Sequence, residues 1–246
     1  TTFNQSQEML PAQAAPATKR WLPLESNPDV VNKYIRGMGA GPQWEFHDVF
    51  GTDPELLGMV PQPVLAVVLL FPITAVCKAN SDALISKIQS EGQVVSPDVW
   101  FCKQTISNAC GTIGILHALG NCPPVMENGG WIKSFFEKCS TLDADKRAAL
   151  LEGDTELDKC HEAAASEGQT SAPSLEDDVN LHFVAFVCKD GCLYEMDGRK
   201  PFPLNLGPSS HETLLADAVA NIKTRYMDAD PTEVNFNIMA LGPSIQ

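Results

Sequence analysis

The sequence predicts a mixed α/β (α+β) domain whose mostly antiparallel central sheet is flanked by helices. Segments with strand and helix periodicity alternate along the chain, and two strand-like runs, 182–188 and 192–197, are joined by a turn signal at 189–191. The 246 residues are 44% hydrophobic and 20% charged, which is enough apolar surface for a core. Since neither a repeat nor a Pro/Gly-rich linker divides the chain, we expect one domain over 20–246 after a flexible leader over 1–19.

The individual elements follow from hydrophobic period and capping residues. Asn27 is a helix N-cap with Pro28 just inside, and the apolar residues that follow recur at helical spacing. The same criteria predict a short helix beginning at Asp53 and longer helices over 81–91, 108–119, 131–139, 144–151 and 212–227. Further strands are predicted over 44–50, 64–71 and 234–241. The acidic segment 152–178 lacks an apolar period, so we expect a long surface loop there.

The charge balance excludes several classes of function. The formal net charge is −14, which argues against a nucleic-acid partner. No apolar run approaches the roughly 20 residues of a membrane-spanning helix, and the first residues contain no signal-peptide core. We therefore expect a cytoplasmic or nuclear protein with no membrane partner, in which the eight cysteines are reduced thiols. Cys188, Cys192 and Cys160-His161 resemble zinc ligands only loosely, and since a hairpin explains the spacing of the first two, we expect no metal.

Cys110 is the sharpest candidate for a reactive group. It precedes a stretch that is apolar nearly all round, as in a helix buried at the centre of a domain. Ser107 or Asn108 can cap this helix, which leaves Cys110 in the first turn, where unpaired N–H groups and the helix dipole favour a thiolate. The alternative is that Cys110 is one more buried, inert thiol.

A nucleophilic thiol needs a proton acceptor, and His182 is the best placed of the five histidines because it opens a buried strand at a sheet end. Folding the hairpin brings Asp197 level with His182, and a carboxylate beside the imidazole would complete a Cys/His/Asp triad. A plain register would place the two on opposite faces, so the arrangement requires a bulge or a shifted turn, which Gly191 permits. Otherwise His182 is a core residue and Asp197 a turn former.

Several separate blocks of the sequence resemble the ubiquitin carboxyl-terminal hydrolase family of cysteine deubiquitinases. The blocks keep the family's order and spacing from about residue 21 onward; they are Gln104, Asn108-Ala109-Cys110-Gly111-Thr112, Leu181-His182-Phe183 and the run 193–199. The segments 21–25 and 53–57 look like the family's opening blocks and 168–170 like its loop motif, whereas 121–165 matches weakly. The chain most resembles the short, L-type members. The resemblance implies a papain-like cysteine protease domain that removes small adducts or peptides from the C-terminal glycine of ubiquitin or of a related ubiquitin-like modifier, as a monomer and without a cofactor.

The resemblance also implies roles for individual residues. Cys110 would attack the carbonyl of the terminal glycine, His182 would activate the thiol, Asp197 would orient His182, and Gln104 would donate its amide to the oxyanion. The segment 152–174 occupies the place of the loop that crosses the family's active site, and its acidity suits the basic tail of ubiquitin. Ubiquitin contacts are expected at Pro23, Leu24, Glu25, Ser26, Asn27, Pro28, Ala165, Ser166, Glu167, Gly168, Gln169, Thr170, Ser171, Ala172, Glu233, Val234, Asn235 and Phe236.

Two other classes of function stay open from the residues alone. The first is a ubiquitin-binding module with little turnover that stabilises free ubiquitin, because a misaligned His182 would be invisible in the sequence. The second is a redox-active thiol protein, which eight cysteines allow but no Cys-x-x-Cys pair supports.

Overall fold

The fold is built on a twisted antiparallel sheet, and the computed structural model describes residues 19–126, 129–168 and 180–245. Six strands lie in the order β1-β6-β2-β3-β4-β5, and every neighbouring pair is antiparallel. The strands are β1 (Trp44–Asp48), β2 (Ala66–Pro72), β3 (Leu181–Lys189), β4 (Cys192–Met196), β5 (Leu204–Pro208) and β6 (Asn237–Pro243). The expected mixed α/β class with an antiparallel sheet is confirmed.

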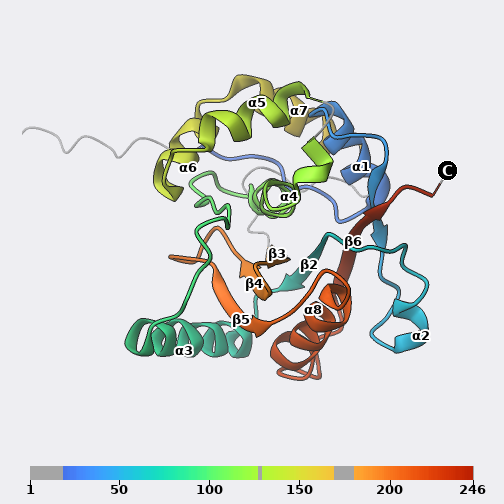
Figure 1. The fold of residues 1–246 in the computed structure, drawn as a ribbon, viewed down its shortest axis with the longest axis vertical. Helices are drawn as coiled ribbons and strands as arrows, with labels where there is room; N and C mark the ends of the chain where they lie inside the picture. The colour runs from blue at the N-terminus through green and yellow to red at the C-terminus, as the bar shows by residue number, and fades with distance from the viewer. Residues whose placement is uncertain (1–18, 127–128, 169–179, 246) are drawn as a thin grey trace, which may run out of the picture.

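Helices cover both faces of this sheet, as Figure 1 shows. One face carries α1 (Pro28–Gly37), α4 (Cys110–Gly120), α5 (Gly130–Cys139), α6 (Ala144–Glu152) and α7 (Thr155–Ala165). The other carries α3 (Ala75–Glu91) and α8 (Leu214–Ile222), while the short helices α2 (Pro54–Leu57) and η1 (Pro123–Met126) lie in connections. No helix of the described residues is long and apolar enough to cross a membrane.

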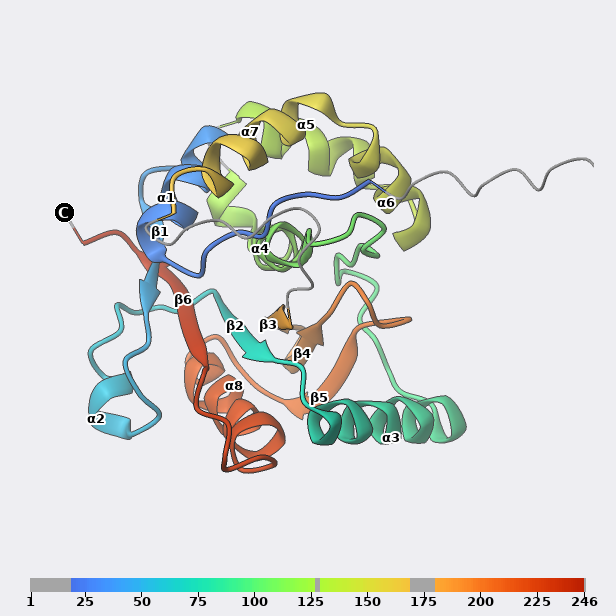
Figure 2. The same cartoon turned by 180° about the vertical axis from the view of Figure 1, so that it is seen from behind.

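Helix α4 is the centre of the domain. It packs on β3 and β2, and the outer helices of the same layer cover its opposite side, so that Cys110 to Leu119 are all buried. This sandwiched position explains why the helix is apolar all round rather than on one stripe. The segment before α1 runs past the start of α4 (Figure 2), where the Trp21 N–H donates to the Ser107 carbonyl at 3.0 Å. The packing therefore fixes the N-terminus of α4 against one end of the sheet.

Several sequence expectations need correction. The segment 152–178 is not all loop, because α7 occupies its first half and Asp154 caps it by accepting from the N–H groups of Glu156 and Leu157. Helix α3 begins at Ala75 behind the cap Thr74, six residues before the expected start. Strand β5 was not expected, and the helix expected over 212–227 is α8 followed by a π-helical turn, η2 (Lys223–Met227).

The β3–β4 hairpin explains how His182 and Asp197 come to share a face. The turn consists of Asp190 and Gly191 alone, with φ of 46° and 75°, so Lys189 pairs with Cys192. A three-residue turn would shift the register by one residue and turn the side chains of β4 to the other face. The sequence allowed either a bulge or a shifted turn. The structure has the shifted turn, and no bulge interrupts the β3–β4 pairing.

Two buried histidines, His117 in α4 and His161 in α7, make the domain sensitive to acid. Burial is the main reason that the pKa values of His117 and His161 are lowered from 6.5 to about 4. As the pH falls from about 6.5 to 4, each of these histidines is protonated in the unfolded chain but stays neutral in the folded chain. The free energy of unfolding should therefore fall by about 3 kcal/mol for each histidine. Urea unfolding at pH 7 and pH 4.5 measures this loss, and His161→Gln should remove part of it. An unchanged pH dependence in that variant would contradict the prediction.

Candidate active site

Cys110 is the first residue of α4 and is 6% exposed. The residue at the N-cap is Ala109, and no side chain caps the helix, so the expectation that Ser107 or Asn108 does so is wrong. Asn108 instead has a φ of 61°, the left-handed conformation that asparagine tolerates better than most residues. The first-turn N–H groups therefore have no side-chain acceptor and give the thiol an electropositive surrounding.

His182 and Asp197 form a hydrogen-bonded pair at the adjoining end of the sheet. The Nε2 atom of His182 donates to Oδ1 of Asp197 at 2.8 Å, and both side chains are buried. Asp197 follows the last residue of β4, and the backbone N–H of Arg199 donates to the same Oδ1 at 3.0 Å. The other ring nitrogen, Nδ1, is buried and has no hydrogen-bond partner among the described residues. It is the nitrogen left for the thiol.

The electrostatics tie Cys110 to this pair. Burial opposes the thiolate, but the His182 side chain and the Phe183 backbone N–H outweigh it, so the pKa of Cys110 is lowered. Burial also opposes the imidazolium, yet Asp197 and Cys110 raise the pKa of His182 to about 9. Against the same cost of burial, His182 holds the pKa of Asp197 at about 2. At neutral pH His182 is therefore an imidazolium and Asp197 a carboxylate, and beside them the Cys110 thiol loses its proton more readily than an ordinary cysteine.

Gln104 is held near the His182–Asp197 pair by its backbone, which contacts Gly198, the residue that directly follows Asp197. The Gln104 N–H donates to the Gly198 carbonyl at 2.9 Å, and a Cβ atom at Gly198 would lie 3.0 Å from both N and Cβ of Gln104. The side-chain Nε2 donates one hydrogen to the Ile106 carbonyl at 3.0 Å. An amide nitrogen carries two hydrogens, so the second is available to a ligand.

A buried ionic cluster behind Asp197 was not expected from the sequence. Glu195 is fully buried in β4 and contacts both Lys200 and Arg225, and the Lys200 Nζ also lies 3.8 Å from Oδ2 of Asp197. Burial opposes the carboxylate of Glu195, but the charges of Lys200 and Arg225 lower its pKa. The only sequence signal was a charged residue inside an otherwise apolar strand, which requires a buried partner.

The three segments expected to contact ubiquitin meet around the N-terminal segment. The Ser26 Oγ bonds Oδ1 of Asn237, which directly follows Phe236. From the end of α7, Glu167 pairs with Lys33 at 3.1 Å, and a Cβ atom at Gly168 would collide with Glu25. Residues Gln169, Thr170, Ser171 and Ala172 lie outside the described part of the chain.

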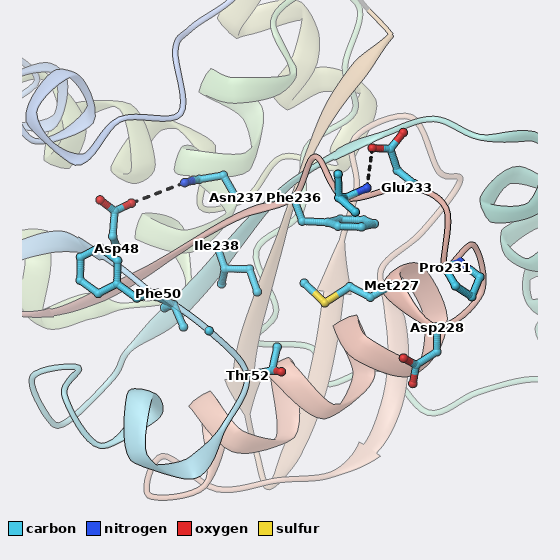
Figure 3. A pocket seen from close by; sticks show the side chains of 13 residues that line it. Asp48, Phe50, Thr52, Met227, Asp228, Pro231, Glu233, Phe236, Asn237 and Ile238 are labelled. Carbon is cyan, nitrogen blue, oxygen red and sulfur yellow. Dashed lines mark hydrogen bonds between the residues drawn. The ribbon is translucent and has the colours of Figure 1, made fainter.

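The third of these segments borders a pocket of about 690 Å³ between β1, β6 and η2, drawn in Figure 3. Phe50, Met227, Phe236 and Ile238 give it an apolar lining. Its rim is acidic, with Asp48, Asp228 and Glu233. Phe50 and Val234 are 74% and 79% exposed, which is unusual for large apolar side chains and typical of a contact surface.

The remaining cysteines and histidines do not assemble into a second centre in the parts of the chain that the structure describes. Burial raises the pKa values of Cys102 and Cys122 to about 12, so these thiols stay protonated. All eight cysteines are free thiols. Within the described ranges no three His, Cys, Asp or Glu residues are placed to hold a metal ion.

Comparison with known proteins points to one family. The model of "Ubiquitin carboxyl-terminal hydrolase, family 1" matches residues 21–228. The chain is 46% identical over 216 residues to a ubiquitin carboxyl-terminal hydrolase of Aplysia californica, covering 87% of this chain and 97% of that protein. It is 42% identical over 237 residues to ubiquitin carboxyl-terminal hydrolase 3 of Arabidopsis thaliana, covering 95% and 99%.

A solved structure is similar over nearly the whole fold. The catalytic domain of Trichinella spiralis UCH37, bound to ubiquitin vinyl methyl ester, superposes with a TM-score of 0.71 at 26% identity, covering 92% of this chain and 96% of that one. The domain is accordingly papain-like. The chain belongs to the ubiquitin carboxyl-terminal hydrolase family of deubiquitinating cysteine hydrolases.

Proposed function

We propose that the chain hydrolyses small adducts from the C-terminal glycine of ubiquitin, with Cys110 as the nucleophile, His182 as the acid and base, and Asp197 as the orienting carboxylate. One observation carries this proposal: a buried thiol with a lowered pKa beside a histidine whose second nitrogen bonds a buried carboxylate. The three residues come from three separate segments, and a thiol that was merely structural would have its pKa raised by burial.

The chemistry follows from the protonation states. The Cys110 thiolate attacks the glycine carbonyl, and His182 gives its Nδ1 proton to the leaving amine, because Nε2 is held by Asp197. The resulting thioester is then hydrolysed by a water that the neutral imidazole deprotonates, which restores the imidazolium. The second N–H of Gln104 stabilises the oxyanion in both steps.

Recognition of ubiquitin would use the converging segments 23–28, 165–172 and 233–236. Glu25 and Glu167 provide negative charge beside the path of a basic tail. The apolar pocket in Figure 3, with its acidic rim, fits a partner surface that presents aliphatic side chains next to basic ones. Ubiquitin bound to a family member in the solved structure supports ubiquitin as the partner of this chain.

Release of a fluorophore from the C-terminus of ubiquitin tests the proposal. The chain should turn over many equivalents, and Cys110→Ala should abolish release while still binding ubiquitin. Turnover that survives in Cys110→Ala would overturn the assignment of the nucleophile. Tight binding without turnover by the unaltered chain would instead identify a ubiquitin-binding module.

Gln104→Ala should lower kcat by about 100- to 1,000-fold, which is typical for loss of one oxyanion donor. The affinity for ubiquitin should change little, because the donor acts on charge that develops only in the transition state. Steady-state kinetics with the fluorogenic substrate separates kcat from KM. Gln89→Ala, which alters an exposed glutamine on α3, is the matched control. A change in KM alone would assign Gln104 to substrate binding.

A further inference from the structure

A second pocket, of about 370 Å³, is lined by residues that directly precede the nucleophile, and the mechanism above uses only Gln104 of that lining. Its polar lining includes Gln104, Ser107 and Asn108, which lead into Cys110, and it has two cationic residues, Arg20 and Arg199. We call it the arginine pocket. Both arginines are exposed at its edge.

The backbone holds both arginines in place. Arg20 forms a parallel bridge with Ser107, flanked by hydrogen bonds from Trp21 N–H to Ser107 O at 3.0 Å and from Ser107 N–H to Lys19 O at 2.9 Å. Arg199 is fixed through its backbone N–H, which bonds Oδ1 of Asp197 at 3.0 Å. The positive charge of Arg199 also contributes to lowering the pKa of Cys110. The backbone therefore fixes the positions from which the two exposed side chains extend.

Two lining residues also have polar atoms without a partner. Nδ2 of Asn108 and Oε1 of Gln104 are buried and make no hydrogen bond among the described residues. A buried amide group that is left unpaired costs free energy unless a ligand or water satisfies it. The pocket thus combines two guanidinium groups with unsatisfied amide atoms, which suits a ligand carrying both a carboxylate and peptide groups.

Charge also separates this pocket from the path of ubiquitin. The N-terminal segment has Glu25 on the side where Gly168 and the end of α7 approach it, whereas Arg20 lies five residues earlier, beside Ser107. A basic ubiquitin tail is attracted to the first side and repelled by the second. The leaving group, which lies on the other side of the scissile bond from the ubiquitin tail, is then the part of the substrate that can enter the arginine pocket.

We infer that the arginine pocket binds the leaving group and selects ubiquitin adducts with a carboxylate close to the scissile bond, such as peptides with Asp or Glu in their first residues. The inference rests on the proposed hydrolysis of ubiquitin adducts and specifies its substrate class. Guanidinium groups bind carboxylates by paired, charge-assisted hydrogen bonds, so an acidic leaving group is held in place while the thiolate attacks.

The test compares ubiquitin extended at its C-terminus by short peptides that are identical except for Asp, Asn or Lys at the second position after the terminal glycine. The unaltered chain should cleave the Asp peptide about 5- to 20-fold faster than the Asn peptide in kcat/KM, and the Lys peptide slowest. Arg199→Gln and Arg20→Gln should each reduce the Asp/Asn ratio, and Arg199→Lys should restore part of it. Lys87→Gln on α3 removes an equal charge from an exposed site elsewhere and should leave the ratio unchanged. Raising the salt concentration should lower the ratio because exposed charges are screened.

Ubiquitin linked to a neutral fluorophore is measured beside the peptides. Normal release of the fluorophore with an Asp/Asn ratio near one would overturn this inference and leave the proposed function intact. An Asp/Asn preference that is insensitive to both arginine substitutions would also overturn it. Failure to cleave every ubiquitin substrate, the fluorophore included, would overturn the proposed function and this inference together.

Discussion

Replacing His182 by Ala should lower kcat/KM for a ubiquitin-linked fluorophore by about 1,000- to 10,000-fold, because the thiol loses both its activating cation and the acid for the leaving group. The reactivity of Cys110 should change with it. In the unaltered chain the lowered pKa of Cys110 predicts faster alkylation of Cys110 by iodoacetamide at neutral pH than of Cys102, whose pKa burial raises. In His182→Ala the effect of burial, which raises the pKa of Cys110, is no longer opposed by the imidazolium. Alkylation of Cys110 should therefore rise only at more alkaline pH. Peptide mass spectrometry separates Cys110 from the other thiols.

The pH dependence of turnover gives an independent check on the same pair. Because the pKa of His182 is raised to about 9, hydrolysis should persist through neutral pH and fall as the pH rises through about 9, where the leaving group loses its acid. His211→Ala alters an exposed histidine and should leave both profiles unchanged. If His182→Ala retained activity within tenfold of the unaltered chain, His182 would not be the general acid.

Glu195→Ala should destabilise the fold by about 3–5 kcal/mol, because it leaves Lys200 and Arg225 without their shared carboxylate in a buried site. Among the described residues, Asp197 would then be the remaining counterion of Lys200, and the attraction would draw that carboxylate away from His182. We therefore expect a lower denaturation midpoint and, in the folded fraction, slower hydrolysis. Urea unfolding and the kinetics of the folded protein at low temperature measure the two effects separately.

A double-mutant cycle distinguishes the ionic cluster from a simple loss of packing. Lys200→Met combined with Glu195→Ala should cost less than the two single substitutions added together, because the pair is removed without leaving Lys200 unpaired. Glu156→Ala on α7 removes an exposed carboxylate and should change the stability by less than about 0.5 kcal/mol. Additive costs for Glu195 and Lys200 would show that the two side chains are not energetically coupled.

The sequence predicts best those features that depend on neighbouring residues. Asn27 and Pro28 set the start of α1, and Asn27 accepts from the N–H of Asp29 as a cap should. The apolar surface of α4 on every side indicated a central helix. Cys110 does lie in its first turn, although the cap at Ser107 or Asn108 from which that position was predicted is absent. The pairing of β3 with β4 was also predictable, because the turn signal lies between two runs of buried residues.

Other features depend on small differences that the residue types do not display. The buried positions of α7 are Leu157, His161, Ala164 and Ala165, which have helical spacing but little hydrophobicity among many acidic residues. Whether the hairpin turn holds two residues or three decides which face Asp197 occupies, and the turn signal is compatible with both. The pairing of Glu195 with Arg225 spans 30 positions and required the fold itself.

Trapping with ubiquitin that carries a C-terminal electrophile tests the central claim most directly. The thiolate of Cys110 should attack the electrophile, and intact-mass and peptide analysis should find one ubiquitin per chain, attached at Cys110 and absent from Cys110→Ala. The adduct should form much more slowly in His182→Ala. Attachment at another of the eight cysteines, or no adduct on a chain that binds ubiquitin, would contradict the assignment of Cys110, His182 and Asp197 as the catalytic group.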